Sequence, residues 1–287
     1  MSEAKLVQAK DLSDELGDPT LCILDATVFL RREIDGGPYV VESGRHSYDE
    51  SHIPGAVFAD VAGELSDPDS PHRFGVPEPE YFARAIGALG VGEGTRVVVY
   101  AQESPMWATR LWWLLRYFGF RDARVLDGGL VAWIDAGLPV TSRVSVVRER
   151  TFVAATRREF LATKDDVLEG LDGAPVCLVN ALPARAFRGE EPGAYSRPGR
   201  IPGSVSLPSS ELLDSTTGRF HDAERLTLIL ESVMALKDTP IIAYCGGGIS
   251  ATVDVFALSL LGRDDVKLYD GSLTEWSADP SLPLIVG

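Results

Sequence analysis

The segment Cys245-Gly246-Gly247-Gly248-Ile249-Ser250 has the residue types and spacing that nucleophilic chemistry requires. Cys245 supplies a thiol, whose thiolate form is the nucleophile. Three glycines remove side chains and permit positive φ, so successive main-chain N–H groups can curl around one point. A helix that starts near Ser250 adds unpaired N–H donors and the positive end of its dipole. The segment therefore predicts a cysteine nucleophile beside an anion-binding loop.

Other interpretations of a cysteine followed by glycines fit this loop less well. A P-loop that binds nucleotide phosphates needs a lysine after its glycines, and none follows here. A cysteine-dependent phosphatase or arsenate reductase needs an arginine six residues after the cysteine to hold the oxyanion, and that place is Ala251. For Cys22 and Cys177, each inside an apolar run, we favour burial as a small apolar residue.

An internal repeat indicates which parts of the fold must position this loop. Four segments of the first half recur in the second half in the same order, which indicates two copies of one domain. The paired segments are 21–26 and 176–181, 51–56 and 199–204, 97–100 and 241–244, and 126–129 and 269–272. We therefore predict an N-terminal domain over 1–142, a linker over 143–157 and a C-terminal domain over 158–287.

Each copy alternates short apolar strands with helices. In the second copy we expect a strand at 240–244, a helix at 250–261 and a strand at 266–269; in the first copy, a strand at 97–100 and a helix at 106–118. This alternation predicts the α/β class, with a parallel sheet in each domain and helices on both faces. Ligands bind such sheets at the carboxyl ends of their strands, which is where the Cys245 loop would lie.

The matching loop of the first copy serves as an internal control. It reads Ala-Gln-Glu-Ser-Pro-Met over 101–106, with alanine in place of the cysteine and no glycine. Such a loop has no nucleophile and cannot cradle an anion well. We therefore expect the N-terminal domain to be catalytically silent.

Taken together, these features resemble the tandem rhodanese-type sulfurtransferases, which act on thiosulfate or 3-mercaptopyruvate. The resemblance rests on the duplicated domain, on His-Ile-Pro-Gly-Ala at 52–56 with Arg-Ile-Pro-Gly-Ser at 200–204, on the Asp-Gly turns at 127–128 and 270–271, each followed by a tryptophan, and on the single cysteine loop. It implies two rhodanese-like domains, Cys245 as the catalytic residue and a persulfide stabilised by the main chain of Gly246, Gly247, Gly248, Ile249 and Ser250. It implies no metal and no organic cofactor.

The resemblance leaves the sulfur donor open. Thiosulfate enzymes of the animal type have a loop like Cys-Arg-Lys-Gly-Val-Thr, whose two cations correspond here to Gly246 and Gly247. Mercaptopyruvate enzymes have a loop like Cys-Gly-Ser-Gly-Val-Thr, whose serine belongs to a Ser–His–Asp arrangement. Here the serine place is Gly247, the histidine place is Phe74 with His72 two residues away, and the aspartate matches Asp60.

Because two of those three groups are missing, we expect thiosulfate as the donor, with cyanide, a thiol or a thioredoxin-like reductant as the acceptor. The alternatives are a 3-mercaptopyruvate sulfurtransferase or a sulfur carrier without enzymatic activity.

An anionic sulfur donor needs cations to bind it, and the segment 185–200 carries four arginines against two glutamates. The resemblance places donor-binding arginines in this region, and we favour Arg188 and Arg197. The other interpretation is surface arginines paired with Glu190 and Glu191. The four candidates are Arg185, Arg188, Arg197 and Arg200.

The whole chain is acidic, since 27 Lys and Arg stand against 42 Asp and Glu for a net charge of −15. That balance argues against binding to nucleic acid or to an anionic membrane. Three cysteines cannot form a disulfide framework, and the polar start of the chain lacks the apolar run of a signal peptide. We therefore expect a cytoplasmic protein. No histidine has a partner at metal-ligand spacing, so no metal site is predicted.

Overall fold

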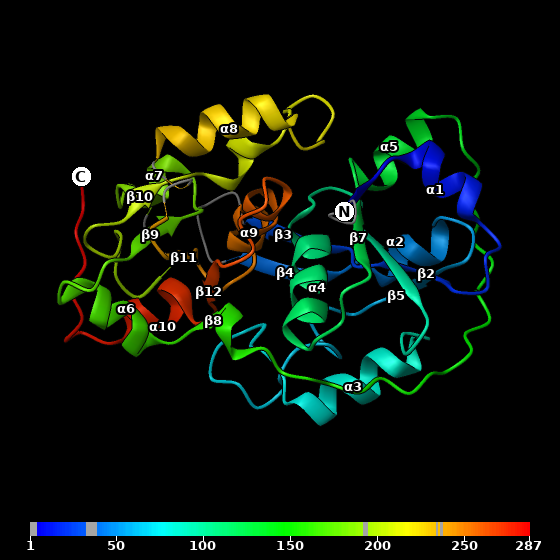
Figure 1. The fold of residues 1–287 in the computed structure, drawn as a ribbon, viewed down its shortest axis with the longest axis horizontal. Coiled ribbons are helices and arrows are strands. Elements are labelled where there is room, and N and C mark those ends of the chain that lie inside the picture. The colour runs from blue at the N-terminus through cyan, green and yellow to red at the C-terminus, as the bar shows by residue number, and fades with distance from the viewer. Residues whose placement is uncertain (1–4, 33–38, 192–194, 234, 236–237) are drawn as a thin grey trace.

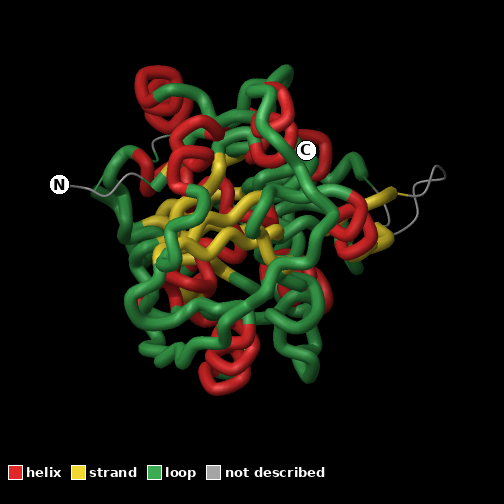
Figure 2. The backbone as a smooth tube through the Cα atoms, turned by 90° about the vertical axis from the view of Figure 1, so that its right-hand side faces the viewer, coloured by secondary structure: helices red, strands yellow, loops and turns green. Residues whose placement is uncertain are grey.

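The chain forms two domains of the same α/β architecture, side by side along the long axis of the molecule (Figure 1). The computed structural model describes residues 5–32, 39–191, 195–233, 235 and 238–287. Each domain contains a five-stranded parallel sheet. Seen from the side, the strands gather in the interior and the helices surround them (Figure 2).

The two sheets have the same strand order. The first runs β1-β7-β6-β2-β5 and the second β8-β12-β11-β9-β10, all pairs being parallel. The strands of the first sheet are β1 (Leu6–Val7), β2 (Leu21–Asp25), β5 (Ala56–Phe58), β6 (Arg96–Tyr100) and β7 (Ala123–Leu126). Those of the second are β8 (Leu161–Ala162), β9 (Cys177–Asn180), β10 (Val205–Ser206), β11 (Ile241–Tyr244) and β12 (Lys267–Tyr269). The predicted duplication is thereby confirmed at the level of topology.

Helices cover both faces of the first sheet, as the alternation predicted. In β6, Val98 and Tyr100 pack with Leu12 of α1 and Trp133 of α5, whereas the neighbouring valines pack on the other face with α3 and α4. The helices are α1 (Ala9–Glu15), α2 (Arg45–Glu50), α3 (Pro79–Ala88), α4 (Met106–Tyr117), α5 (Gly129–Asp135), α6 (Lys164–Leu171), α7 (Ala184–Phe187), α8 (Ala223–Ser232), α9 (Ala251–Leu260) and α10 (Ser272–Ala278). Two short 3₁₀ helices are η1 (Arg158–Phe160) and η2 (Ser209–Leu212).

One element of the N-terminal domain was not predicted. β3 (Val28–Arg32) and β4 (Tyr39–Ser43) form an antiparallel hairpin outside the main sheet. The second copy has no counterpart among the described residues. The two copies therefore differ by an insertion as well as by their loops.

Helices α4 and α9 form the centre of the domain interface (Figure 1). Each of these helices is followed by a glycine with positive φ, Gly119 after α4 and Gly262 after α9. Thr109 and Thr252 both lie ten residues before that glycine, so they occupy equivalent positions in the two helices. Their hydroxyl oxygens lie 2.8 Å apart. The two domains are thus related by an approximate twofold axis, as in an isologous contact, and each helix N-terminus brings its loop to the neighbouring domain.

Tryptophans fill this interface and the two domain cores. Trp112 of α4 packs edge-to-face on Phe256 of α9, with ring centroids 4.7 Å apart. Trp133 and Trp276, which follow the two Asp-Gly turns, donate their indole N–H to the carbonyls of Pro139 and Pro283. Trp276 is fully buried, so its role is packing rather than cover for the cysteine loop.

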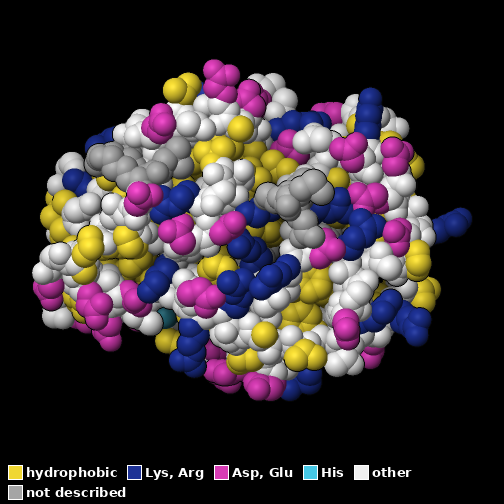
Figure 3. Space-filling view, in the orientation of Figure 1, with side chains coloured by type: hydrophobic (Ala, Val, Ile, Leu, Met, Phe, Trp, Pro, Cys, Tyr) yellow, Lys and Arg dark blue, Asp and Glu magenta, His cyan; other side chains and the backbone are white. Residues whose placement is uncertain are grey.

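Residues 142–157 contain neither helix nor strand and run along the N-terminal domain. Arg150 N donates to the carbonyl of Gly87, and Phe152 packs on Phe82. The domain limits 1–142 and 158–287 remain predictions. Among the described residues, none of the helices has the length and apolar character needed to cross a bilayer. On the face seen in Figure 3, acidic side chains are scattered, whereas Lys and Arg gather around a hollow near its middle.

Candidate active site

The Cys245 loop leaves the carboxyl end of β11, the central strand of the second sheet. The turn between β12 and α10 holds its first residues. Cys245 N donates to Ser272 Oγ at 3.0 Å, Leu273 N to the Cys245 carbonyl at 3.1 Å, and Thr274 N to the Gly246 carbonyl at 2.8 Å. The Asp-Gly-Ser segment of the sequence repeat is therefore the support on which the loop is built. Cys245 is 2% exposed.

The loop contains consecutive main-chain N–H groups for which no described residue is the hydrogen-bond acceptor. The N–H groups of 246–250 make no hydrogen bond to the described part of the chain, although Gly246, Gly248 and Ile249 are buried. A buried N–H without an acceptor is costly. Gly248 has φ +73°, which turns the chain back on itself. Anion binding by these N–H groups stays a prediction, and their lack of acceptors among the described residues is compatible with it.

Each of the three glycines has a different surrounding. A Cβ at 246 would overlap the hydroxyl of Tyr195, and a Cβ at 248 would meet Asp270 Oδ1 at 2.6 Å and its carbonyl at 2.8 Å. A Cβ at 247 would meet only Thr274 Oγ1, at 3.8 Å. Arginine at 246, as in the animal thiosulfate enzymes, would thus require Tyr195 to move. Serine at 247 would fit without rearrangement.

The N-terminal domain contributes a buried arginine to the loop. Arg110 of α4 is fully buried and pairs with Asp270 at 2.6 Å. Its guanidinium also donates to the carbonyls of Phe74 at 2.6 Å and Gly248 at 3.3 Å. Asp270 in turn accepts from Val76 N at 3.0 Å. One guanidinium thus fixes the turn of the cysteine loop against the other domain.

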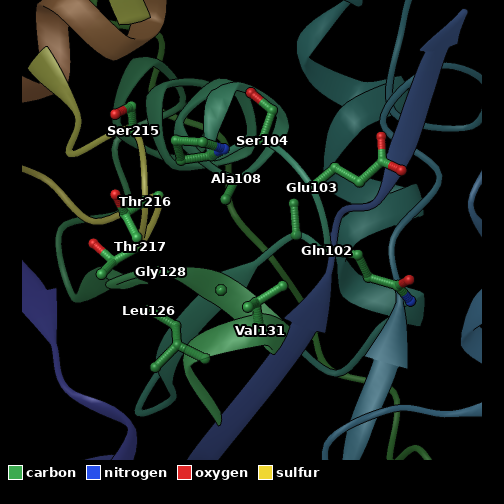
Figure 4. A pocket seen from close by; sticks show the side chains of 14 residues that line it. Gln102, Glu103, Ser104, Ala108, Leu126, Gly128, Val131, Ser215, Thr216 and Thr217 are labelled. Carbon is green, nitrogen blue, oxygen red and sulfur yellow. The ribbon is translucent and has the colours of Figure 1, made fainter. Parts of the chain in front are cut away.

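The equivalent place in the N-terminal domain is a pocket without a nucleophile (Figure 4). Its volume is about 220 Å³, and residues 215–218 of the C-terminal domain form its far wall, opposite Gln102 and Glu103 (Figure 4). The Glu103 carboxylate is held by two hydrogen bonds of 3.0 Å from Arg31. Hydroxyls and a carboxylate replace the thiol and the free N–H groups of the other copy. The physical basis for a silent first copy is therefore present.

The other cysteines lie in environments that disfavour a thiolate. Burial raises the pKa of Cys22 to about 12, and its thiol donates to the Leu89 carbonyl at 3.3 Å. Burial also raises the pKa of Cys177. Asp25 is likewise buried, with a raised pKa caused first by burial, and it caps the turn at Thr27. These placements agree with the burial expected for Cys22 and Cys177 and indicate a structural role for Asp25.

The four arginines expected to bind the donor are engaged elsewhere in the structure. Arg197 spreads its guanidinium over four main-chain carbonyls between 276 and 282. Arg200 donates to the carbonyls of Phe187 and Gly287. Arg188 pairs with Glu190 at 2.7 Å, and exposed Arg185 lies 4.0 Å from the same carboxylate. Donor binding by these residues stays a prediction, and the contacts favour the surface interpretation for Arg185 and Arg188.

The Ser–His–Asp arrangement is incomplete in the structure as in the sequence. Phe74 at the histidine place has φ +67° and packs edge-to-face on Trp107. His72 N donates to Ser70 Oγ. No hydrogen bond among the described residues joins His72 or Asp60 to the cysteine loop. The imidazole and hydroxyl of that arrangement are therefore absent from this loop.

Sequence reasoning missed two residues that touch the loop. Tyr195 lies over Gly246, within the segment searched only for arginines. Arg110 comes from the first copy, on the helix expected at 106–118. The available signal was a cation in the middle of a largely apolar helix, since such a charge is rarely buried without a partner.

Comparisons with known proteins agree with the resemblance seen in the sequence. The description Rhodanese-like domain matches residues 8–136 and again 164–279. The 3-mercaptopyruvate sulfurtransferase of Rattus norvegicus is 34% identical over 279 residues, which covers 94% of this chain and 91% of the relative. The thiosulfate sulfurtransferase of Gallus gallus is 34% identical over 277 residues, covering 94% and 92%. The crystal structure of SseA from Escherichia coli, which represents the 3-mercaptopyruvate sulfotransferases, superposes with a TM-score of 0.82 at 34% identity, covering 94% of this chain and 98% of that one.

Proposed function

This chain belongs to the tandem rhodanese-like sulfurtransferases, and we propose that it takes sulfur from 3-mercaptopyruvate and passes it on through a persulfide on Cys245. The observation that carries the proposal is the buried thiol at the start of a loop whose N–H groups 246–250 are unused. The name of the rat relative and that of the Escherichia coli structure support the donor. Thiosulfate, the donor expected from the sequence, becomes the second candidate.

The first half-reaction is a displacement at sulfur. The Cys245 thiolate attacks the thiol sulfur of 3-mercaptopyruvate, and a sulfur–sulfur bond forms while the carbon–sulfur bond breaks. The electron pair of that bond leaves as the enolate of pyruvate, which takes up the proton of the former thiol. The products are pyruvate and a Cys245 persulfide anion. The N–H groups of the loop and the start of α9 stabilise the negative charge on sulfur.

The second half-reaction returns the enzyme to its starting state. A thiolate or cyanide attacks the outer sulfur of the persulfide, and the sulfur–sulfur bond breaks in favour of the Cys245 thiolate. With cyanide as the acceptor this step needs no external reductant, because the transferred sulfur leaves as thiocyanate. A thiol acceptor becomes a persulfide, which a thioredoxin-like reductant can reduce. The sequence is covalent and ping-pong.

Thiosulfate is kept as a candidate for a specific reason. Gly247 and Phe74 stand where mercaptopyruvate enzymes carry the serine and the histidine, so the hydroxyl and the imidazole of that arrangement are missing for the carbonyl of 3-mercaptopyruvate. Thiosulfate needs only hydrogen-bond donors that stabilise its negative charge, and sulfite leaves without taking up a proton. The Gallus gallus relative supports this second reading. In either case we propose that the chain works in the cytoplasm.

The deciding experiment compares both donors on one preparation. Formation of thiocyanate from cyanide is measured with 3-mercaptopyruvate and with thiosulfate over a range of concentrations, and kcat/KM is compared. Intact-mass measurement after incubation with donor alone should show one added sulfur atom, absent in Cys245→Ser. The control variant Cys22→Ser should retain both the added mass and the turnover.

Each outcome separates the alternatives. A higher kcat/KM for 3-mercaptopyruvate supports the proposal, and a higher value for thiosulfate replaces it with the second candidate. Loading of Cys245 without turnover by cyanide or thiols would indicate a sulfur carrier. Full activity of Cys245→Ser would contradict the mechanism for every donor.

A further inference from the structure

A second cavity with a concentrated positive charge lies between the domains, away from the cysteine loop. It measures about 630 Å³ and is bounded by the first residues of β6 and β7, the end of α4, and η1 of the C-terminal domain. These are the amino ends of the strands, the opposite edge from the one that carries Cys245. Figure 3 shows Lys and Arg gathered around a hollow near the middle of the molecule.

The charge of this basic cleft contrasts with that of the chain. Six cations line it against two carboxylates, in a protein of net charge −15. The carboxylates are Asp122 and Asp264. The cations are Lys5, Arg96, Arg116, Arg121, Arg124 and Arg157. Clustered like charges repel one another unless a counter-ion is near, so the cleft is a place where an anion is stabilised.

Neighbouring acids do not neutralise these cations one for one. Asp264 serves both Lys5, at 2.7 Å, and Arg116, at 3.0 Å. Glu15 likewise forms ion pairs with both Arg96 and Arg124, at 2.6 Å each. Asp18 assists Arg96, and Arg157 lies 2.8 Å from Glu159. Arg121 forms no ion pair with any residue in the described part of the chain.

The guanidinium groups of Arg116 and Arg157 are held in place rather than free to move away. Both stack on the ring of Phe160, with their carbons 5.0 and 4.6 Å from its centroid. Arg116 is also 4.9 Å from the ring of Trp112. Burial lowers the pKa of Arg116. Asp264 opposes this shift, whereas the nearby charges of Arg157 and Arg121 add to it. Arginines fixed this way are prepared for an anion, because little side-chain entropy remains to be lost.

Capping of helix ends explains only part of this cluster. Lys5 donates to the carbonyl of Ser259 in the last turn of α9, and Arg116 lies in the last turn of α4, where cations are favourable. That role does not apply to Arg121 and Arg157, which lie outside both helices. These two residues also come from different parts of the fold, since Arg121 follows α4 and Arg157 precedes η1. An anion between them would contact both the end of α4 and the linker that leads into η1.

We propose that the basic cleft binds a small anion that carries several phosphate groups, in the free inorganic form or as part of a nucleotide. Guanidinium groups match phosphate oxygens with paired hydrogen bonds. Arg121, which has no ion pair among the described residues, lies in the cleft beside arginines that share their carboxylates, so an anion with several phosphate groups reaches more of these cations than a single phosphate does. The volume accommodates a triphosphate chain. The site is separate from the cysteine loop, so the proposal does not depend on which sulfur donor the protein uses.

The test is calorimetric titration of the full chain with inorganic triphosphate at low salt. We expect saturable binding at one site that weakens as salt is raised. ATP and adenosine distinguish the sources. Equal affinity of ATP and triphosphate assigns recognition to the phosphate chain alone, tighter ATP binding assigns it to a nucleotide, and adenosine should not bind. Cys245→Ala should bind triphosphate as the wild type does, which separates this result from the sulfur-transfer proposal.

Variants of the two arginines outside the helices locate the site without disturbing α4. Arg121→Glu with Arg157→Gln should lower the affinity for triphosphate at least about tenfold, the effect of losing charge-assisted hydrogen bonds. The matched control is Arg31→Gln, an exposed arginine outside the cleft, which should leave the affinity unchanged. Absence of triphosphate binding to the wild type, or equal binding by the double variant, would overturn the proposal.

Discussion

Arg110 of the N-terminal domain and Asp270 of the C-terminal domain form a buried ion pair of 2.6 Å that also holds the carbonyl of Gly248. The guanidinium is fully buried, whereas 17% of the Asp270 side chain is exposed. The pair therefore couples the docking of the two domains to the shape of the cysteine loop. Arg110 acts here as a positioning residue, since its side chain contacts the loop at the main-chain carbonyl of Gly248.

Replacement of Arg110 should affect stability and sulfur transfer together. Arg110→Ala leaves the Asp270 carboxylate and two carbonyls without their donor, and breaking a buried pair costs about 3–5 kcal/mol. We expect a loss of that size in the free energy of unfolding, measured with urea, and a fall in kcat. Arg31→Ala, which removes an exposed pair, should change stability by less than about 1 kcal/mol. Equal effects of the two variants would contradict the role given to Arg110.

Gly248→Ala should lower activity more than Gly247→Ala. Position 248 has φ +73° and its Cβ would meet Asp270, whereas position 247 is open. Holding a non-glycine residue in that conformation costs about 1–3 kcal/mol, which corresponds to a roughly 5- to 150-fold loss of rate if the loop must keep its shape. The measurement is kcat/KM for both donors. A Gly247→Ala variant as impaired as Gly248→Ala would show that the turn at 248 is not what matters.

Gly247→Ser should shift donor preference toward 3-mercaptopyruvate. The structure leaves room for this hydroxyl, since the nearest atom to a Cβ is Thr274 Oγ1 at 3.8 Å. One donor aimed at a developing oxyanion is worth up to about 10²–10³ in rate, so a tenfold gain in the ratio of kcat/KM values is expected. Gly246→Ser is the control, because its side chain overlaps Tyr195 and should lower activity with both donors. An unchanged ratio in Gly247→Ser would contradict this expectation.

Asp166 should make a pH-dependent contribution to stability. Burial alone would raise the pKa of Asp166, but hydrogen bonds from Lys267 and Thr163 outweigh it and lower that pKa to about 2. The unfolded value is about 3.9, so the contribution is complete above that pH and is lost as the pH falls through about 2. The free energy of unfolding of Asp166→Asn should therefore lie below that of the wild type at pH 6 and approach it toward pH 2. Exposed Asp165→Asn should show no such trend.

The sequence predicted the architecture because the duplication repeats whole supersecondary units. Strands and helices around the Cys245 loop begin and end within a residue or two of the expected positions, since β-branched runs and the glycines after each helix mark them clearly. The first Asp-Gly turn and the second perform the same task, as the repeat implied. Leu130 N and Leu273 N donate to the carbonyls of Ala101 and Cys245, respectively.

Contacts between the copies could not be predicted in the same way. The role of Arg110 depends on which surfaces of the two domains meet, and a motif in one domain carries no record of its neighbour. Tyr195 lies over Gly246 of its own domain, a tertiary contact that the local sequence does not encode either. The partners of the arginines could not be predicted either. The resemblance places donor-binding arginines in the region of Arg197, which stays a prediction, but the carbonyls that its guanidinium contacts belong to the end of the chain, a tertiary relationship that the local sequence does not encode.

The approximate twofold relationship bears on the origin of this chain. Phe220 N donates to Asp127 at 2.9 Å, and Val76 N donates to Asp270 at 3.0 Å, so each half makes the same contact with the other. That reciprocity is what the subunits of a homodimer share, and in such an ancestor both nucleophiles would have been equivalent. In a single polypeptide the two halves are free to differ. Here one loop carries Cys245 and the other Ala101, while the half without the cysteine still provides the surface on which the Cys245 loop rests.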